Sequence, residues 1–305
     1  MKDLHELPKL RDSLSYIYVE HALVERDNHA IQLIDQTGRV RVPAAALCVL
    51  LLGPGTNITH GAMKVLAENG CSVVWVGEEG MRCYAHGLGE TRKAYHTLKQ
   101  AALASDAQCR ARVVRRMYQK RFDVELDPEL SLPQIRGLEG VRMRTAYAEA
   151  SRTYGVAWEG RRYDFKNWNN SDPVNRALSA ANALLNGICH AAIVSGGYSP
   201  AIGFIHTGRQ LSFVYDIADL YKTEITIPIA FKTVSESCEQ VDKRVRQACR
   251  EKFREVKLLE RILPDIDELL ELKELDREEE EWIDPQQENP LPLWEALYDE
   301  AEVGK

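Results

Sequence analysis

Up to about residue 87, the hydrophobic residues follow the two-residue period of β-strands. Short runs alternate apolar and polar positions or are continuously apolar, and turn formers such as Gly53-Pro54-Gly55 separate them. One helix is expected among them, from His60 to Asn69, with Thr59 as its N-cap and Gly70 as its stop. The expected strands are residues 14–20, 30–35, 40–43, 46–52, 71–77 and 81–87, with the last two forming a hairpin.

Beyond residue 89 the spacing becomes helical. Residues 91–122 read as one long helical pattern, and the chain stays mostly helical to about residue 270. The predicted fold class is α+β with two domains. A small N-terminal β-sandwich-like domain covers residues 1–89, and a larger all-α domain covers residues 90–275. Residues 276–305 are predicted to be an acidic, partly flexible tail.

The net charge of −7 conceals two regions of opposite sign. Residues 260–305 contain 17 acidic and 4 basic residues, whereas residues 1–259 contain 29 acidic and 35 basic residues. A basic body is compatible with phosphate binding, although so small an excess does not establish it. Basic residues crowd the second half of the 91–122 pattern, where they make either an exposed charged face or a phosphate-binding face.

The sequence also bears on compartment and cysteine chemistry. The N-terminus is charged, and the longest apolar run, residues 44–52, is too short to span a bilayer, so we expect a soluble cytoplasmic protein. The seven cysteines are scattered and never spaced as CxxC. This argues against a disulfide framework or a zinc cluster, and most are expected to be small core residues.

The most informative stretch is residues 196–222, a turn-rich loop that leads into a helix. His206 precedes the helix, and Asp216 and Asp219 lie three residues apart on it, so the three groups are expected to converge. The simpler interpretation is a loop histidine and a solvated acidic face. Against it, the two carboxylates lie in an apolar run, where burial is costly without pairing or a metal ion.

Two further segments carry candidate chemistry. Glu139 lies between Gly137 and Gly140, where a backbone can approach a neighbour closely. The loop 155–174 mixes aromatic with basic residues. Such a loop can clasp a nucleic-acid strand by stacking and phosphate contacts, or it can pack onto the body.

Five long sequence segments resemble a known family, and together they span nearly the whole chain. They are LxPGTxxxHGA (52–62), VVWVGEEGMRCYAHG (73–87), QIRGLEGVRMR (134–144), YGVAWEGRRYDFKNW (154–168) and GYSPAIGFIHTGRQLSFVYDIADLYK (197–222). In this order they resemble the CRISPR-associated integrase family of spacer acquisition, the larger of the two universal adaptation proteins. Within that family the chain resembles the type I-E branch.

The resemblance implies a metal site and a set of DNA contacts. The family's divalent-metal ligands match Glu139, His206 and Asp219, and a further acidic residue needed for activity matches Asp216. The implied cofactor is Mg²⁺ or Mn²⁺. His206 could instead serve as a general acid or base. The implied DNA-binding positions are Lys64, Arg82, Lys243, Arg246 and Arg250 on the backbone, Tyr163, Trp168 and Arg209 near the active centre, and His21 at the duplex end.

Two positions depart from the family pattern, because this branch commonly has Tyr where this chain has His21 and Asn186.

By resemblance the partners are double-stranded DNA, a second copy of the chain bound through the N-terminal domains, and a small ferredoxin-like adaptation protein. Two integrase dimers would flank one dimer of that protein. The expected function is metal-dependent insertion of short DNA fragments into a CRISPR repeat array. The alternatives are a catalytically silent DNA-binding scaffold and a small-molecule metal hydrolase.

Overall fold

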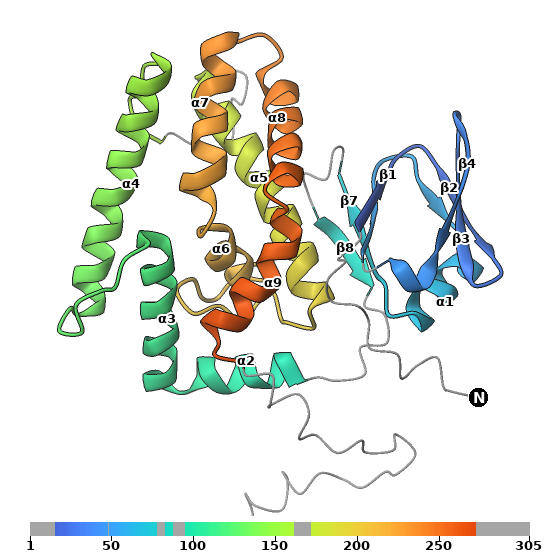
Figure 1. The fold of residues 1–305 in the computed structure, drawn as a ribbon, viewed down its shortest axis with the longest axis horizontal. Coiled ribbons are helices and arrows are strands. Elements are labelled where there is room, and N and C mark those ends of the chain that lie inside the picture. Colours follow the sequence, from blue (N-terminus) through green and yellow to red (C-terminus); the bar gives the residue numbers. More distant parts are fainter. Residues whose placement is uncertain (1–15, 48, 78–82, 88–94, 162–171, 273–305) are drawn as a thin grey trace, which may run out of the picture. The chain divides into compact units, whose positions relative to one another are not determined.

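The computed structural model describes residues 16–47, 49–77, 83–87, 95–161 and 172–272 (Figure 1). Strands occupy the N-terminal part of this range and helices the rest, so the expected α+β class is confirmed. The predicted domain boundary at residues 89–90 and the acidic tail from residue 276 lie outside the described residues. Both stay predictions.

The described strands form two four-stranded sheets. In the first, β1 (Tyr16–Val19), β5 (Val49–Leu52) and β7 (Ser72–Val76) run parallel, and β8 (Cys83–Gly87) pairs antiparallel to β7. The pairing expected of residues 71–77 with 81–87 is thereby confirmed. The second sheet has the order β4-β3-β2-β6, with bounds Gly38–Pro43, Ala30–Asp35, Leu23–Asp27 and Asn57–Ile58. A 3₁₀ turn, η1 (Ala44–Ala46), precedes β5.

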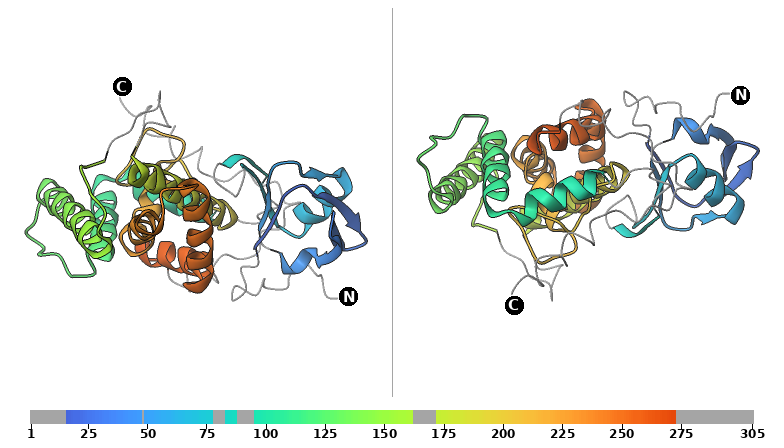
Figure 2. Two further views of the ribbon diagram at one scale, coloured as in Figure 1. Left: turned by 90° about the horizontal axis from the view of Figure 1, so that it is seen from above. Right: turned by 90° about the horizontal axis from the view of Figure 1, so that it is seen from below.

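The two sheets share one hydrophobic core with helix α1 (His60–Glu68). Val24 and Ile31 from the second sheet, Leu50 from the first and Leu66 from α1 are all buried in it. Figures 1 and 2 show α1 lying against the strands. Its N-cap is Thr59, as expected, with the hydroxyl accepting a hydrogen bond from the Ala62 N–H at 3.3 Å.

The predicted helix over residues 91–122 is wrong in one respect, because it is two helices. The break lies at Asp106, whose carboxylate accepts a hydrogen bond of 2.7 Å from the Cys109 N–H and so starts a new helix.

The helical elements are α2 (Tyr95–Ser105), α3 (Ala107–Phe122), α4 (Leu132–Tyr154), α5 (Pro173–Ser195), α6 (Ser212–Ala218), η4 (Lys222–Thr226, a π-helical turn), α7 (Ile227–Glu236), α8 (Val241–Glu255) and α9 (Leu258–Leu269).

Helix α5 is the centre of the helical region and packs against α6, α7, α8 and α9. Residues 173–194 are long and apolar enough to cross a membrane, but 67% of the helix window is buried inside the protein, as expected for a core helix. Ala191 of α5 also joins a buried cluster with Val49, Leu51, Val74 and Val76 of the first sheet. This cluster connects the sheet to the helices.

The described part of the loop 155–174 packs onto the body. Trp158 stacks on Tyr147 with ring centroids 4.6 Å apart, and it also meets the edge of Phe231. Arg161 donates hydrogen bonds to Asn175 and Ser179 on α5. Residues 162–171 lie outside the described residues, so the nucleic-acid alternative stays open for them.

Candidate functional site

Asp216 on α6 organises the loop that precedes its own helix. One carboxylate oxygen accepts hydrogen bonds from the backbone N–H groups of Phe204 and Ile205, at 2.6 and 3.1 Å. The other accepts from the backbone N–H of His206 at 2.9 Å and contacts its ring Nδ1 at 2.7 Å. Asp216 is fully buried, so these four contacts replace the water that its charge has lost.

This arrangement fixes the orientation of the His206 ring. Because this carboxylate already accepts from three backbone N–H groups, it also accepts from Nδ1, and in the neutral imidazole Nε2 then has a free lone pair. The imidazole side chain is 43% exposed, which leaves it accessible to a ligand. Carboxylate–histidine pairs of this kind orient metal-binding or proton-transferring imidazoles, with the carboxylate as the positioning group.

Arg110 of α3 binds the same loop. Its guanidinium donates two hydrogen bonds to the carbonyl oxygen of Phe204, at 3.0 and 2.8 Å. This arginine belongs to the basic run on α3, for which an exposed face or a phosphate-binding face was expected. Arg110 has neither of these roles, because its hydrogen bonds stabilise the conformation of a loop.

Glu139 and Asp219 lie on either side of one buried guanidinium. Arg121 of α3 is 4% exposed. Its Nη1 lies 3.7 Å from Oε1 of Glu139, and its Nη2 lies 3.4 Å from Oδ2 of Asp219. Nη2 also donates a hydrogen bond to the backbone carbonyl of Asp216 at 3.2 Å. Helices α3, α4 and α6 therefore bring three of the predicted residues to a single arginine.

Further cations complete the surroundings of the two carboxylates. Nζ of Lys222 lies 2.5 Å from Oδ1 of Asp219, and Nη1 of Arg142 lies 3.6 Å from Oε2 of Glu139. Burial acts to raise the pKa of Asp219, but the charges of Lys222 and Arg121 outweigh it and hold this pKa below its ordinary value. His206 also acts to lower the pKa of Asp219, so the two side chains are close enough to influence one another.

The donor set fits a hard divalent cation in two respects. Oε2 of Glu139 is buried without a hydrogen-bond partner among the described residues, and the arginine contacts of 3.4–3.7 Å exceed ordinary hydrogen-bond length. Carboxylate lone pairs that Lys222 does not use therefore remain free. Two carboxylates and one imidazole suit Mn²⁺ or Mg²⁺. Among the described residues, however, these three ligands do not form a group with all ligand atoms within 4.8 Å of one another.

One detail of the expectation for Glu139 is wrong. Gly137 and Gly140 lie within helix α4, and no atom lies within 4 Å of the position that a Cβ would take on Gly137. A Cβ on Gly140 would meet only the end of the Arg144 side chain, at 3.7 Å. The glycines therefore do not serve a close backbone approach.

The predicted DNA contacts fall into three groups. Lys243, Arg246 and Arg250 share one face of α8; Lys243 is exposed, and Arg250 lies over the Tyr18 ring at 5.6 Å. Lys64 on α1 is exposed and lies 3.6 Å from Glu68, while His21 and Arg209 are exposed on loops. Arg82, Tyr163 and Trp168 lie outside the described residues. At Asn186, the second departure from the family pattern, the side-chain oxygen is buried and finds no hydrogen-bond partner in the part of the chain that the structure describes.

Arg121 and Lys222 are members of the site that were not predicted from the sequence. A signal existed for Arg121, because Val114, Met117 and Tyr118 precede it at helical spacing and all are buried. An arginine on such a stripe must point inward and find a carboxylate. For Lys222, three residues after Asp219, the spacing alone was the signal.

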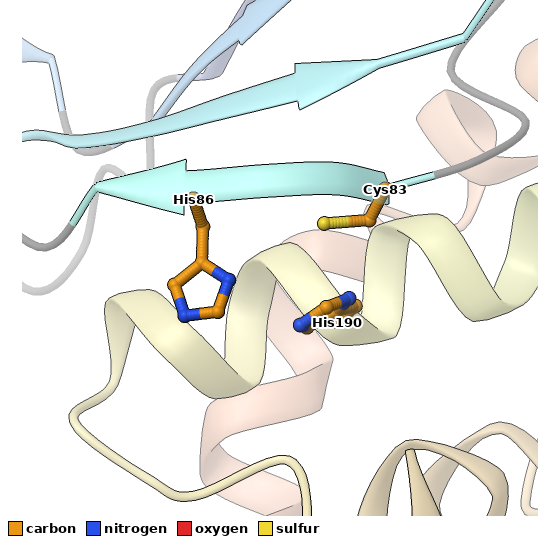
Figure 3. A group of neighbouring side chains, drawn as sticks. All are labelled: Cys83, His86 and His190. Carbon is orange, nitrogen blue, oxygen red and sulfur yellow. The ribbon is translucent and has the colours of Figure 1, made fainter. Parts of the chain in front are cut away.

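A second group of side chains, also missed, lies between the first sheet and α5. Cys83, His86 and His190 each offer a ligand atom, and these atoms all lie within 4.8 Å of one another (Figure 3). Burial, together with the charge of His86, lowers the pKa of His190 to about 4. The absence of CxxC spacing had argued against such a cluster.

The fold and the site define an α+β protein whose helices gather carboxylates, an imidazole and an arginine. The family model described as CRISPR associated protein Cas1 matches residues 15–126 and 120–250. The chain belongs to the Cas1 family, and the expected membership is confirmed.

Similar proteins cover most of the chain. It is 54% identical to CRISPR-associated endonuclease Cas1 2 of Thermus thermophilus, over 99% of this chain and 93% of that protein. It is 45% identical to CRISPR-associated endonuclease Cas1 of a Clostridium species, over 95% and 94%. A chain in the crystal structure of a TtCas1–DNA complex superposes with a TM-score of 0.78 at 55% identity, covering 88% of this chain and 100% of that one.

Proposed function

We propose that this chain is a divalent-metal-dependent DNA endonuclease and integrase of CRISPR adaptation. It would insert short DNA fragments into a CRISPR repeat array by attack of a 3′-hydroxyl on a phosphodiester. Curated relatives that cover nearly the whole chain are named endonucleases, and a similar structure is a complex with DNA. The assignment to the type I-E branch belongs to the same proposal.

One observation carries the proposal. Asp216 binds Nδ1 of His206 and leaves Nε2 free, while Asp219, whose pKa His206 lowers, meets Glu139 at Arg121. These residues lie on α4, on the 196–211 loop and at the end of α6. A purely structural ion-pair network does not need an oriented, half-exposed imidazole.

The chemistry divides among these groups. When bound by Glu139, His206 and Asp219, the cation would activate the attacking oxygen and stabilise the leaving oxygen. Asp216 orients the imidazole and keeps its proton on Nδ1. Arg121 and Lys222 place positive charge where a phosphodiester must approach two carboxylates, and so reduce the repulsion between them.

A catalytically silent DNA-binding scaffold is the alternative, and one observation favours it. Arg121, Arg142 and Lys222 already neutralise Glu139 and Asp219 without any ion. If those ion pairs are permanent, the site is structural. A small-molecule metal hydrolase has no such observation in its favour.

The test separates strand joining from DNA binding. Purified protein is incubated with a labelled duplex carrying free 3′ ends and a plasmid carrying a repeat array, in Mn²⁺, Mg²⁺ or EDTA. We expect joined product only with a cation. Glu139→Gln, His206→Ala and Asp219→Asn should each reduce joining by at least about 100-fold, with DNA affinity within about threefold of the original. Normal DNA binding without joining under any condition would establish the scaffold instead.

The assembly completes the proposal. We propose a cytoplasmic homodimer formed through the N-terminal β-rich domains, two of which flank a dimer of a small ferredoxin-like adaptation protein on double-stranded DNA. Joining that rises when this partner protein is added would support the arrangement.

A further inference from the structure

A β-bulge places Cys83 and His86 on the same face of the first sheet. Residues three apart on a regular strand point to opposite faces. Here the β7–β8 register shifts, so that Cys83 pairs with Val76 and His86 pairs with Val74. Val74 and Val76 are both buried in the cluster that includes Ala191 of α5. The bulge therefore turns Cys83 and His86 toward that helix (Figure 3).

His190 of α5 meets these two residues from the opposite side. Its ring lies edge-on to His86, with centroids 5.4 Å apart and an interplanar angle of 72°. His190 is 6% exposed, and neither ring nitrogen has a hydrogen-bond partner among the described residues. A buried imidazole normally has a partner on at least one nitrogen, so this ring is suited to a ligand.

We propose that Cys83, His86 and His190 bind a zinc ion that joins strand β8 to helix α5. One thiolate and two imidazoles form a donor set typical of Zn²⁺ and unsuited to Mg²⁺, which prefers oxygen. With Zn–S near 2.3 Å and Zn–N near 2.0 Å, tetrahedral ligand atoms lie roughly 3.5 Å apart. The observed limit of 4.8 Å thus requires side-chain shifts on the order of 1 Å.

The fourth coordination position would be open to water, because His86 is exposed and Cys83 is half-buried. On binding, the Cys83 thiol loses its proton to solvent, and zinc takes up the sulfur lone pair. The bound ion would hold β8, an edge strand of its sheet, against the central helix of the helical region. This site shares no residue with Glu139, His206 and Asp219, so the inference is independent of the proposed integrase chemistry.

The test uses the full-length chain, stripped of metal with a chelator and titrated with Zn²⁺ against a chromophoric competitor. We expect one zinc per chain at this site. Cobalt(II) used in place of zinc should give a thiolate-to-cobalt charge-transfer band, which only a cysteine ligand produces.

The variants Cys83→Ser and His86→Ala should each weaken zinc binding by at least about 100-fold, and the first should abolish the cobalt band. The matched controls are Cys238→Ser and His29→Ala, which replace an exposed cysteine and an exposed histidine outside the group. They should change neither the zinc affinity nor the cobalt band. Circular dichroism verifies that each variant folds. Because Cys83 and His86 are not buried, their replacement should spare the core.

Two results would overturn the proposal. One is a folded protein that takes up no zinc; the other is zinc uptake that Cys83→Ser leaves unchanged, which would place the ion elsewhere. Neither result touches strand joining with Mn²⁺ or Mg²⁺, so failure of the zinc site and failure of the integrase proposal are distinguishable.

Discussion

At the scale of single residues, Asp216 and His206 have separable roles that stability measurements can resolve. Asp216→Asn replaces one carboxylate oxygen, an acceptor, with an NH₂ group, a donor. Backbone N–H groups of the 204–206 loop that this oxygen binds are then left unpaired. We expect a loss of about 2 kcal/mol in the free energy of unfolding. We also expect a loss of strand joining, because the His206 ring is no longer held. Urea unfolding and a joining assay measure the two effects.

His206→Ala is the matched control for that experiment. It removes one ring contact of a side chain that is 43% exposed, so the free energy of unfolding should fall by less than about 1 kcal/mol. Strand joining should still be lost. Equal destabilisation by the two variants would mean that Asp216 does not organise the loop as described.

The sequence could predict candidate ligands here but not their partners. His206, Asp216 and Asp219 stand out because charged and imidazole groups lie in an apolar run. That Asp216 would bind a loop, and Asp219 a buried arginine from α3, depends on how α3 and α6 pack. One-dimensional spacing does not contain that information. The Cys83 group was missed for a related reason, since a bulge and a distant helix create it.

At the scale of elements, helix α5 depends on its N-cap. Asp172 accepts a hydrogen bond from the Asn175 N–H at 2.9 Å and a second from the Asn175 side chain at 2.6 Å. Asp172→Ala should lower the free energy of unfolding by about 1–2 kcal/mol, because both donors lose their acceptor. Asp172→Ser keeps a capping oxygen and should cost less than half as much. Urea unfolding of both variants measures these losses. If Asp172→Ala unfolds at the same urea midpoint as the unchanged protein, the cap contributes nothing to stability.

Elements with strong local signals were predicted well. The strand 30–35 and the helix beginning at His60 match the structure, because alternation and a Thr59 cap mark them. Strand β2 was missed, since LVERD carries three charges in five residues, although it forms a tight hairpin with β3, the next strand along the chain. The break at Asp106 was missed because apolar spacing continues across it, although an aspartate is a frequent N-cap.

At the scale of the whole molecule, charge is segregated along the chain. The acidic excess of residues 260–305 conceals a basic excess in the residues before them. Several of those basic groups serve the fold, as Arg110 and Arg121 do, so they are not available to DNA phosphates. A count of charges therefore overestimates the DNA-binding surface, and only exposed cations remain as candidates.

Helix α8 provides the sharpest test of that surface. Lys243 is exposed and shares a face with Arg246 and Arg250, whereas Lys252 lies half a turn around the helix and pairs with Glu255 at 2.7 Å. If the first face contacts phosphates, Lys243→Ala should reduce the slope of log affinity against log salt by about one, through loss of counterion release. Lys252→Ala should leave that slope unchanged. Fluorescence anisotropy with a labelled duplex at several salt concentrations measures both slopes, and equal effects of the two substitutions would remove α8 from the DNA interface.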